Sequence, residues 1–130
     1  MRALVVLSIC AVCSRSSVAP HALPYAASGR KYCVEGMHLR VGMEAFESPP
    51  YVLRNPSGEW VGLSVDILTQ LSVEAGFTFE ISDYAKRDTE TWDGVFSRSL
   101  DNYDLIGSWW FQKHSRSALG DFLPPYVDSQ

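Results

Sequence analysis

The sequence predicts an α/β domain, in which helices flank a mostly parallel sheet. Three observations lead to this prediction. Several segments alternate polar and apolar residues, two segments with helical apolar spacing lie between them, and 130 residues fit one domain or part of one. The order strand, helix, strand, helix, strand favours parallel pairing, because each connection must cross over the sheet.

The composition is that of a globular domain and argues against several other classes. Apolar residues make up 46% of the chain and charged residues 20%, which excludes collagen-like and disordered chains. The 11 basic and 15 acidic residues give a net charge of −4. We therefore expect no nucleic-acid partner. No stretch reaches the about 18 apolar residues that would span a bilayer.

The first residues are typical of an export signal. Met1-Arg2 is followed by an apolar run over 3–13 and then by small and polar residues. The alternative is a buried strand or helix at the N-terminus. We predict a signal peptide and linker over 1–27, a further linker over 28–37, and a folded unit over 38–130.

The folded unit is expected to begin with a strand and a small hairpin. Residues 38–43 alternate in polarity and predict the first strand. A loop over 44–50 contains two prolines, which cannot donate to a ladder. Short strands over 51–53 and 59–62 flank a turn at 55–58, where proline takes the second turn position.

A helix and a second strand follow the hairpin. Ser64 offers an N-cap, and an apolar stripe at helical spacing continues to Ala75. Gly76 is the expected end of this helix. Residues 77–82 alternate as a strand, and a charged loop is expected over 83–90.

The second helix and the last strand complete the predicted sheet. Thr91 is a candidate N-cap for a helix over 92–102, whose apolar residues share one face. A short apolar strand is predicted over 103–107. Near Ser115 a helical turn is expected to begin.

Three aromatic residues and one arginine follow this strand. Trp109-Trp110-Phe111 comes directly after the predicted strand end, where open parallel sheets bind ligands. The planar guanidinium of Arg116 suits a carboxylate. In the other interpretation Arg116 pairs with a local acid such as Asp121 and the aromatic rings are core. Position and chemistry alone leave both open.

Eight motifs then occur in an order that resembles a known family. They are L-R-V-G (39–42), E-S-P-P-Y (47–51), G-L-S-V-D-I-L (62–68), G-F-T-F-E (76–80), T-W-D-G-V-F (91–96), Y-D-L-I (103–106), the isolated Arg116, and D-F-L-P-P-Y (121–126). Together they resemble the type 2 periplasmic binding proteins, and specifically the first ligand-binding segment of ionotropic glutamate receptors. The likeness runs from Leu39 to about Ser129.

The resemblance implies a partial fold. The family fold has two α/β lobes joined by a hinge that close on a ligand, and this chain resembles lobe one only. We therefore expect the second lobe of the same domain to be a missing partner. Contact with a membrane would come only through sequence absent from this chain.

The resemblance also implies site residues. Arg116 would hold the α-carboxylate of an amino-acid-like ligand, Tyr51 would cap the ligand, and the backbone carbonyl of Trp109 would accept from its amino group. Phe111 stands where the family usually has Thr or Ser, so it keeps the N–H and loses the hydroxyl. Glu47 resembles an acid that can bridge the lobes.

The function implied is extracellular amino-acid binding by the ligand-sensing segment of a receptor-like, ligand-gated ion channel. The alternative is a truncated soluble, secreted amino-acid-binding protein. We expect no enzyme, because the loop acids Glu44 and Glu47 have no nucleophile–base pair beside them. The histidines at 21, 38 and 114 are too scattered for a shared site, and we expect no metal, cofactor or catalytic residue.

Overall fold

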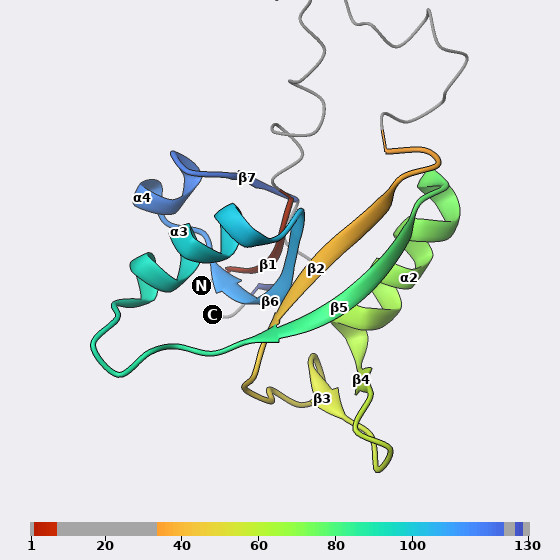
Figure 1. Cartoon of the computed structure of the whole chain (residues 1–130), viewed down its shortest axis with the longest axis horizontal. Helices are drawn as coiled ribbons and strands as arrows, with labels where there is room; N and C mark the ends of the chain where they lie inside the picture. Colours follow the sequence, from red (N-terminus) through yellow and green to blue (C-terminus); the bar gives the residue numbers. More distant parts are fainter. Residues whose placement is uncertain (1, 8–33, 124–126, 129–130) are drawn as a thin grey trace, which may run out of the picture.

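The computed structural model describes residues 2–7, 34–123 and 127–128. Figure 1 shows the arrangement of the elements. In chain order these are β1 (Arg2–Leu7), β2 (His38–Glu44), β3 (Leu53–Arg54), β4 (Trp60–Val61), α2 (Leu63–Ala75), β5 (Thr78–Tyr84), α3 (Trp92–Asn102), β6 (Leu105–Phe111), α4 (His114–Ser117), β7 (Asp121–Phe122) and β8 (Val127–Asp128).

The predicted α/β class and parallel pairing are confirmed. The main sheet has the order β5-β2-β6-β1-β7, with β8 also paired to β1. Strand β2 is parallel to β5 on one side and to β6 on the other. The pairs that β1 forms with β6, β7 and β8 are antiparallel. Helices α2 and α3 provide the crossovers that parallel neighbours require.

The sheet buries apolar side chains on both faces. Neighbouring residues of a strand point to opposite sides. Leu105 packs with Val41 and Leu68 in a cluster under α2, whereas Ile106 packs with Val95 and Phe96 in a cluster under α3. Figure 1 shows α2 and α3 on either side of these strands. The core therefore consists of two layers that meet at β2 and β6.

Two of the sequence motifs meet where β2 passes the start of β6. The Arg40 guanidinium binds both carboxylate oxygens of Asp104 at 3.1 Å, and the Arg40 backbone N–H donates to the same carboxylate at 2.8 Å. Beside this pair, a Cβ on Gly42 would lie 2.4 Å from the Tyr103 ring. The strand can pass the ring only because position 42 has no side chain.

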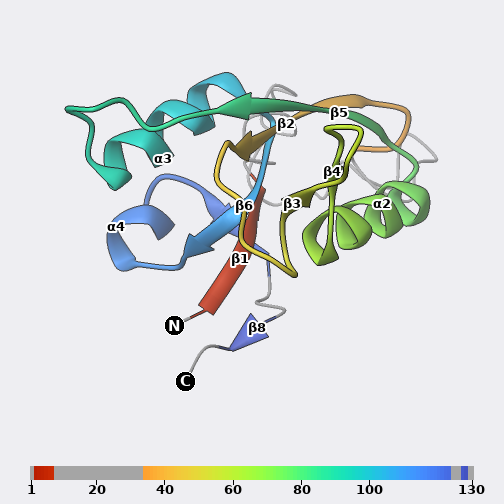
Figure 2. The same cartoon turned by 90° about the horizontal axis from the view of Figure 1, so that it is seen from below.

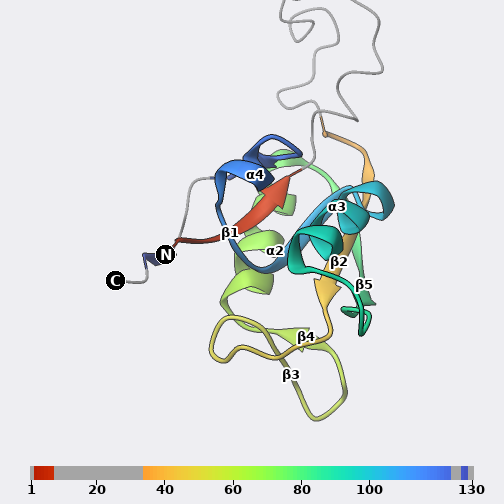
Figure 3. The same cartoon turned by 90° about the vertical axis from the view of Figure 1, so that its left-hand side faces the viewer.

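The β3–β4 hairpin forms a separate two-stranded sheet, and its side chains contact Asp83 of β5. Asp83 accepts from Trp60 Nε1 at 2.7 Å and pairs with Arg54, whose guanidinium lies 4.0 Å from the centre of the Trp60 ring. Figure 3 shows the hairpin beyond the carboxyl end of β2. These contacts fix the loop that leads from β2 to the hairpin.

The predicted N-cap of the first helix is wrong. Helix α2 begins at Leu63, and its N-cap is Gly62 with φ of 112°; Ser64 is buried inside the first turn. The N–H groups of Leu63 and Ser64 donate to the carbonyls of Pro50 and Tyr51 at 3.2 and 2.9 Å. Loop carbonyls therefore satisfy the first helical amides, and no side-chain cap is needed.

The other helix ends agree with the sequence patterns. Gly76 ends α2 in the left-handed conformation with φ of 71°. Thr91 caps α3, since its side-chain oxygen accepts from the Gly94 N–H at 3.1 Å. The short helix α4 lies where a turn near Ser115 was expected.

Strand β6 is longer than the predicted 103–107. It continues to Phe111, where its backbone pairs with Ala3 of β1. The aromatic run Trp109-Trp110-Phe111 therefore lies within the strand and not after it, which corrects the prediction. The reason is the pairing with β1, a partner more than a hundred residues away in the chain.

The predicted export segment lies mostly outside the described residues. Its residues 2–7 form β1, which pairs with β6 and β7. The signal peptide and the boundaries at residues 27 and 37 stay predictions. In the described part of the chain, no helix has the length and apolar character needed to cross a membrane.

Replacing a core ring should unfold the domain far more readily than replacing an exposed one. Phe96 is a fully buried residue of α3 that packs against β6, whereas Phe46 is 69% exposed. We expect Phe96→Ala to lower the free energy of unfolding by about 3–5 kcal/mol, because it leaves a cavity. The matched Phe46→Ala should change it by less than about 0.5 kcal/mol. Equal losses in urea unfolding would contradict this description of the core.

Candidate ligand-binding site

A cavity of about 580 Å³ opens beside the carboxyl ends of β2 and β6. Ligands of open parallel sheets bind at this edge. Aromatic and aliphatic side chains form much of the wall, with a few polar and charged groups among them, as in many small-molecule pockets. The lining residues are Glu44, Phe46, Ser48, Val52, Trp92, Ser108, Trp110, Phe111, Gln112, Lys113 and Arg116.

Arg116 is a buried cation in the wall of this cavity. It lies on α4 and is only 3% exposed. Its Nε donates to Asp93 Oδ1 at 2.7 Å, one terminal nitrogen contacts the same oxygen at 2.7 Å, and the other donates to the Phe111 carbonyl at 3.1 Å. The guanidinium also lies 4.8 Å from the centre of the Trp110 ring. Its charge is therefore balanced by a carboxylate, a carbonyl and an aromatic face.

The acid that pairs with Arg116 is Asp93 and not Asp121. Asp93 is in the first turn of α3, and Figure 2 shows α4 beside α3 next to the end of β6. Asp121 lies on β7 and is exposed. The local-acid interpretation named the wrong residue, because the true partner is 23 positions upstream and is brought close by the crossover helix.

Arg116 has more N–H donors than its contacts with described residues use. A guanidinium has five N–H donors. Contacts with described residues use three of them, one on each nitrogen. One donor on each terminal nitrogen remains, and two such donors match the two oxygens of a carboxylate.

A network of hydrogen bonds connects residues in and behind the cavity wall. Trp110 Nε1 donates to the Tyr84 phenol at 2.8 Å, and that phenol donates to Ser108 Oγ at 3.3 Å. Ser108 Oγ accepts from the Glu44 backbone N–H at 2.5 Å. Burial raises the pKa of Tyr84 to about 12, so the phenol keeps its proton at neutral pH. The network fixes Trp110 and the end of β2 relative to each other.

Glu44 supplies a carboxylate to the same cavity. It is the last residue of β2 and half-buried. Burial raises the pKa of its carboxyl group. Lys113, which is exposed, also lines the cavity. Among the described residues, the charged side chains that line the cavity are therefore Glu44, Lys113 and Arg116.

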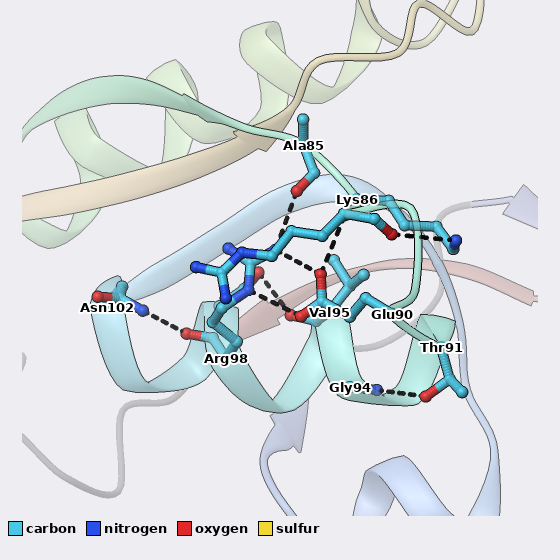
Figure 4. A network of polar contacts seen from close by, with 10 residues as sticks. Ala85, Lys86, Glu90, Thr91, Gly94, Val95, Arg98 and Asn102 are labelled. Atoms are coloured by element: carbon cyan, nitrogen blue, oxygen red, sulfur yellow. Dashed lines mark hydrogen bonds and ion pairs between the residues drawn. The ribbon is translucent and has the colours of Figure 1, made fainter.

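The start of α3 brings Trp92 and Asp93 to the site. The preceding loop is held by Glu90, whose two carboxylate oxygens each accept from Arg98 at 2.8 Å (Figure 4). Arg98 also donates to the Ala85 carbonyl at 2.9 Å. Trp92 is 49% exposed. Its ring packs edge to face on the Trp110 ring, with 6.1 Å between the two ring centres.

The structure brings two of the predicted site residues together at the cavity. Phe111 and Arg116 both line it. Tyr51 packs against a separate cluster that contains Trp60, and Glu47 is exposed; neither belongs to the lining. Trp109 contributes backbone to β6. Its carbonyl contact, and the roles of Tyr51 and Glu47, stay predictions.

Eight of the described lining residues were not singled out as ligand contacts from the sequence, and four of these bear on the proposed site. Trp92 was assigned to the apolar face of a helix, and Glu44 was considered only as a loop acid. Phe46 and Lys113 also line the cavity. One usable signal was present: Trp92 opens a helix directly after a charged loop, at the edge where parallel strands end. Within the described residues, no His, Cys, Asp and Glu side chains gather in threes to form a metal site.

The chain belongs to a family of binding proteins. Residues 39–130 match the family model of the bacterial extracellular solute-binding proteins, family 3. This places the chain in that family, whose description is of extracellular proteins. The comparison with curated proteins gave no match.

Solved structures resemble the chain over about 70% of its length. The arginine-bound form of domain 1 from TmArgBP, a point mutant, is 29% identical with a TM-score of 0.55; the match covers 71% of this chain and 67% of that one. The AvGluR1 ligand binding domain in complex with alanine is 21% identical with a TM-score of 0.51, and the match covers 70% of this chain and 37% of that one. At this lower identity the likeness shows the fold alone.

The Glu90–Arg98 pair should make stability depend on pH in acid. Bonding to Arg98 lowers the pKa of Glu90 from 4.5 to about 2. A lowered pKa stabilises the fold above the unfolded value, and this contribution is lost as pH falls from 4.5 toward 2. We expect Glu90→Gln to be less stable than wild type at pH 7 and the two to converge near pH 2. Parallel pH profiles in urea unfolding would contradict this.

Removing the charge of Asp93 should cost stability. In Asp93→Asn the buried guanidinium of Arg116 exchanges a charged acceptor for a neutral one, so we expect a loss of about 1–3 kcal/mol in the free energy of unfolding. Asp101→Asn, on the exposed end of the same helix, is the matched control and should stay within about 0.5 kcal/mol of wild type. A loss no larger than that of the control would show that the pair is not needed.

Proposed function

We propose that this chain binds an amino acid outside the cell and that Arg116 holds the α-carboxylate of the ligand. One observation carries the proposal: a buried guanidinium lies in the cavity wall, and its contacts with the described residues leave one donor on each terminal nitrogen unused. Membership of an extracellular solute-binding family supports the same conclusion. So does domain 1 from TmArgBP, which is described in an arginine-bound form.

The remaining contacts follow from the geometry and the family likeness. The rings of Phe46, Trp92 and Phe111 line the cavity and would cover the apolar part of the ligand. The Trp109 carbonyl would accept from the ligand's ammonium group. Tyr51 and Glu47 would act from the loop before the hairpin, Tyr51 as a cap and Glu47 toward a second lobe.

Two kinds of protein are candidates for the whole molecule to which this lobe would belong. The order of the eight motifs supports the ligand-sensing segment of a glutamate-receptor-like channel. The 29% identity to domain 1 from TmArgBP supports a soluble binding protein. The coding sequence after Gln130 distinguishes them: an apolar span of about 20 residues would favour the channel, and further α/β pattern would favour the soluble protein.

The role of Arg116 can be tested on the unchanged protein by comparing ligands with and without a carboxylate. We expect residues 1–130 alone to bind free amino acids at millimolar concentrations, because they resemble one lobe and would supply one wall of a two-lobe cleft. The matching amino-acid amides, which lack the carboxylate, should bind at least about tenfold more weakly, since a charge-assisted bond contributes about 1.5–3 kcal/mol. Tryptophan fluorescence titration measures both.

Equal binding of acids and amides would contradict the assignment of Arg116. Arg116→Lys provides a check on the protein side, since it keeps the charge and loses the planar pair of donors. It should weaken binding of the free acid and leave binding of the amide unchanged. Circular dichroism would establish that the variant is folded.

A further inference from the structure

The indole ring of Trp110 supports the guanidinium that is proposed to receive the ligand. The Arg116 guanidinium lies over this ring, 4.8 Å from its centre, and both residues line the cavity. The hydrogen bonds to Asp93 Oδ1 and the Phe111 carbonyl are made by N–H groups, which lie in the plane of the guanidinium. Such bonds restrain the group within its plane, and a ring face restrains tilting out of that plane. The orientation of Arg116 therefore depends on where the Trp110 ring lies.

One hydrogen bond holds the Trp110 ring in a mostly apolar setting. Trp110 is 3% exposed, and its ring packs edge to face with the Phe96 ring, with 5.1 Å between the ring centres. An indole has a single N–H, and that of Trp110 donates to the Tyr84 phenol at 2.8 Å. Burial of apolar surface is not directional, whereas a hydrogen bond is. The Tyr84 hydroxyl therefore defines how the ring is turned.

Tyr84 is itself fixed and lies behind the cavity wall. It is the last residue of β5, it is 5% exposed, and it is not one of the described residues that line the cavity. Its hydroxyl accepts from Trp110 and donates to Ser108 Oγ at 3.3 Å. Its ring packs against Tyr103, with 5.8 Å between the ring centres. Any effect of Tyr84 on a ligand must therefore pass through these neighbours.

We infer that Tyr84 is a positioning residue for carboxylate recognition, because its hydroxyl holds the Trp110 ring in the orientation that supports Arg116. This inference rests on the proposed function, since it concerns how Arg116 receives the carboxylate. Without the hydroxyl, the buried Nε1 of Trp110 would lack its acceptor, and the cost of that loss favours turning of the ring toward another one. The guanidinium would then lose its support, so the contact with the carboxylate would weaken more than the other contacts of the ligand.

Tyr84→Phe tests this inference, because it removes only the hydroxyl. The probes are the common free amino acids and their amides, titrated into residues 1–130 and followed by ligand-detected NMR. For the acid that binds wild type best, we expect Tyr84→Phe to weaken binding by about threefold to tenfold, as for the loss of one hydrogen bond. Binding of the matching amide should change by less than about twofold.

Tyr103→Phe is the matched control. It also removes a buried-side hydroxyl of an aromatic residue, but this hydroxyl donates to the Asp83 carbonyl at 3.3 Å and not to the rings of the site. Both the acid and the amide should bind this variant within about twofold of wild type. Circular dichroism establishes that each variant is folded.

A second pair of variants shows whether Tyr84 acts through Trp110. Trp110→Phe removes the N–H that the Tyr84 hydroxyl accepts. If the hydroxyl acts through this bond, adding Tyr84→Phe to Trp110→Phe should weaken binding of the acid by less than about twofold further. In the unchanged protein, the indole N–H resonance of Trp110 should shift on titration with the acid and shift less with the amide.

The outcomes separate this inference from the proposed function. Unchanged binding of the acid by a folded Tyr84→Phe, equal losses for acid and amide, or losses that add in the double variant would overturn the role of Tyr84. The proposed function would still stand as long as wild type prefers free acids to their amides. Absence of that preference would overturn the proposed function and this inference with it. If a variant does not fold, a wild-type Trp110 resonance that fails to respond to the acid overturns the inference, and a response to the acid alone supports it.

Discussion

Parallel pairing of β2 with both β5 and β6 is the constraint on which the site depends. Parallel neighbours run in the same direction, so their carboxyl ends meet at one edge of the sheet. This brings together Glu44 and Tyr84, which end their strands, with Ser108 and Trp110 of β6. The crossover helix α3 starts at the same edge and supplies the acid for Arg116. The parallel topology therefore explains why the charged side chains, the aromatic rings and the cavity lie at the same edge of the sheet.

Much of the fold could be predicted because its signals are local. Alternation defined β2 and β5, and the Thr91 cap and Gly76 end belong to motifs a few residues long. What failed depends on distant partners. The start of α2 is set by carbonyls of the preceding loop, and the length of β6 is set by pairing with β1. No local pattern in the sequence encodes either contact.

The site was predictable to a similar degree. Arg116 and Phe111 were reached from their motif positions, and both line the cavity. The acid beside Arg116 was not, since choosing Asp93 over Asp121 requires knowing that α3 and α4 lie side by side. Trp92 has the helical spacing of a core residue. Periodicity alone cannot show that the first turn of α3, which contains Trp92, extends past the sheet. Functional side chains at element ends are therefore the ones that sequence patterns describe least well.

The close approach of Gly42 to the Tyr103 ring has a consequence for how related sequences can vary. A methyl group at position 42 would overlap ring carbons of Tyr103 at 2.4 to 2.9 Å, and the ring is itself packed against Tyr84. A larger residue at 42 is accommodated only when the residue at 103 becomes smaller. The two positions should therefore change together among homologues and seldom singly, so that two motifs about sixty residues apart behave in evolution as a single unit.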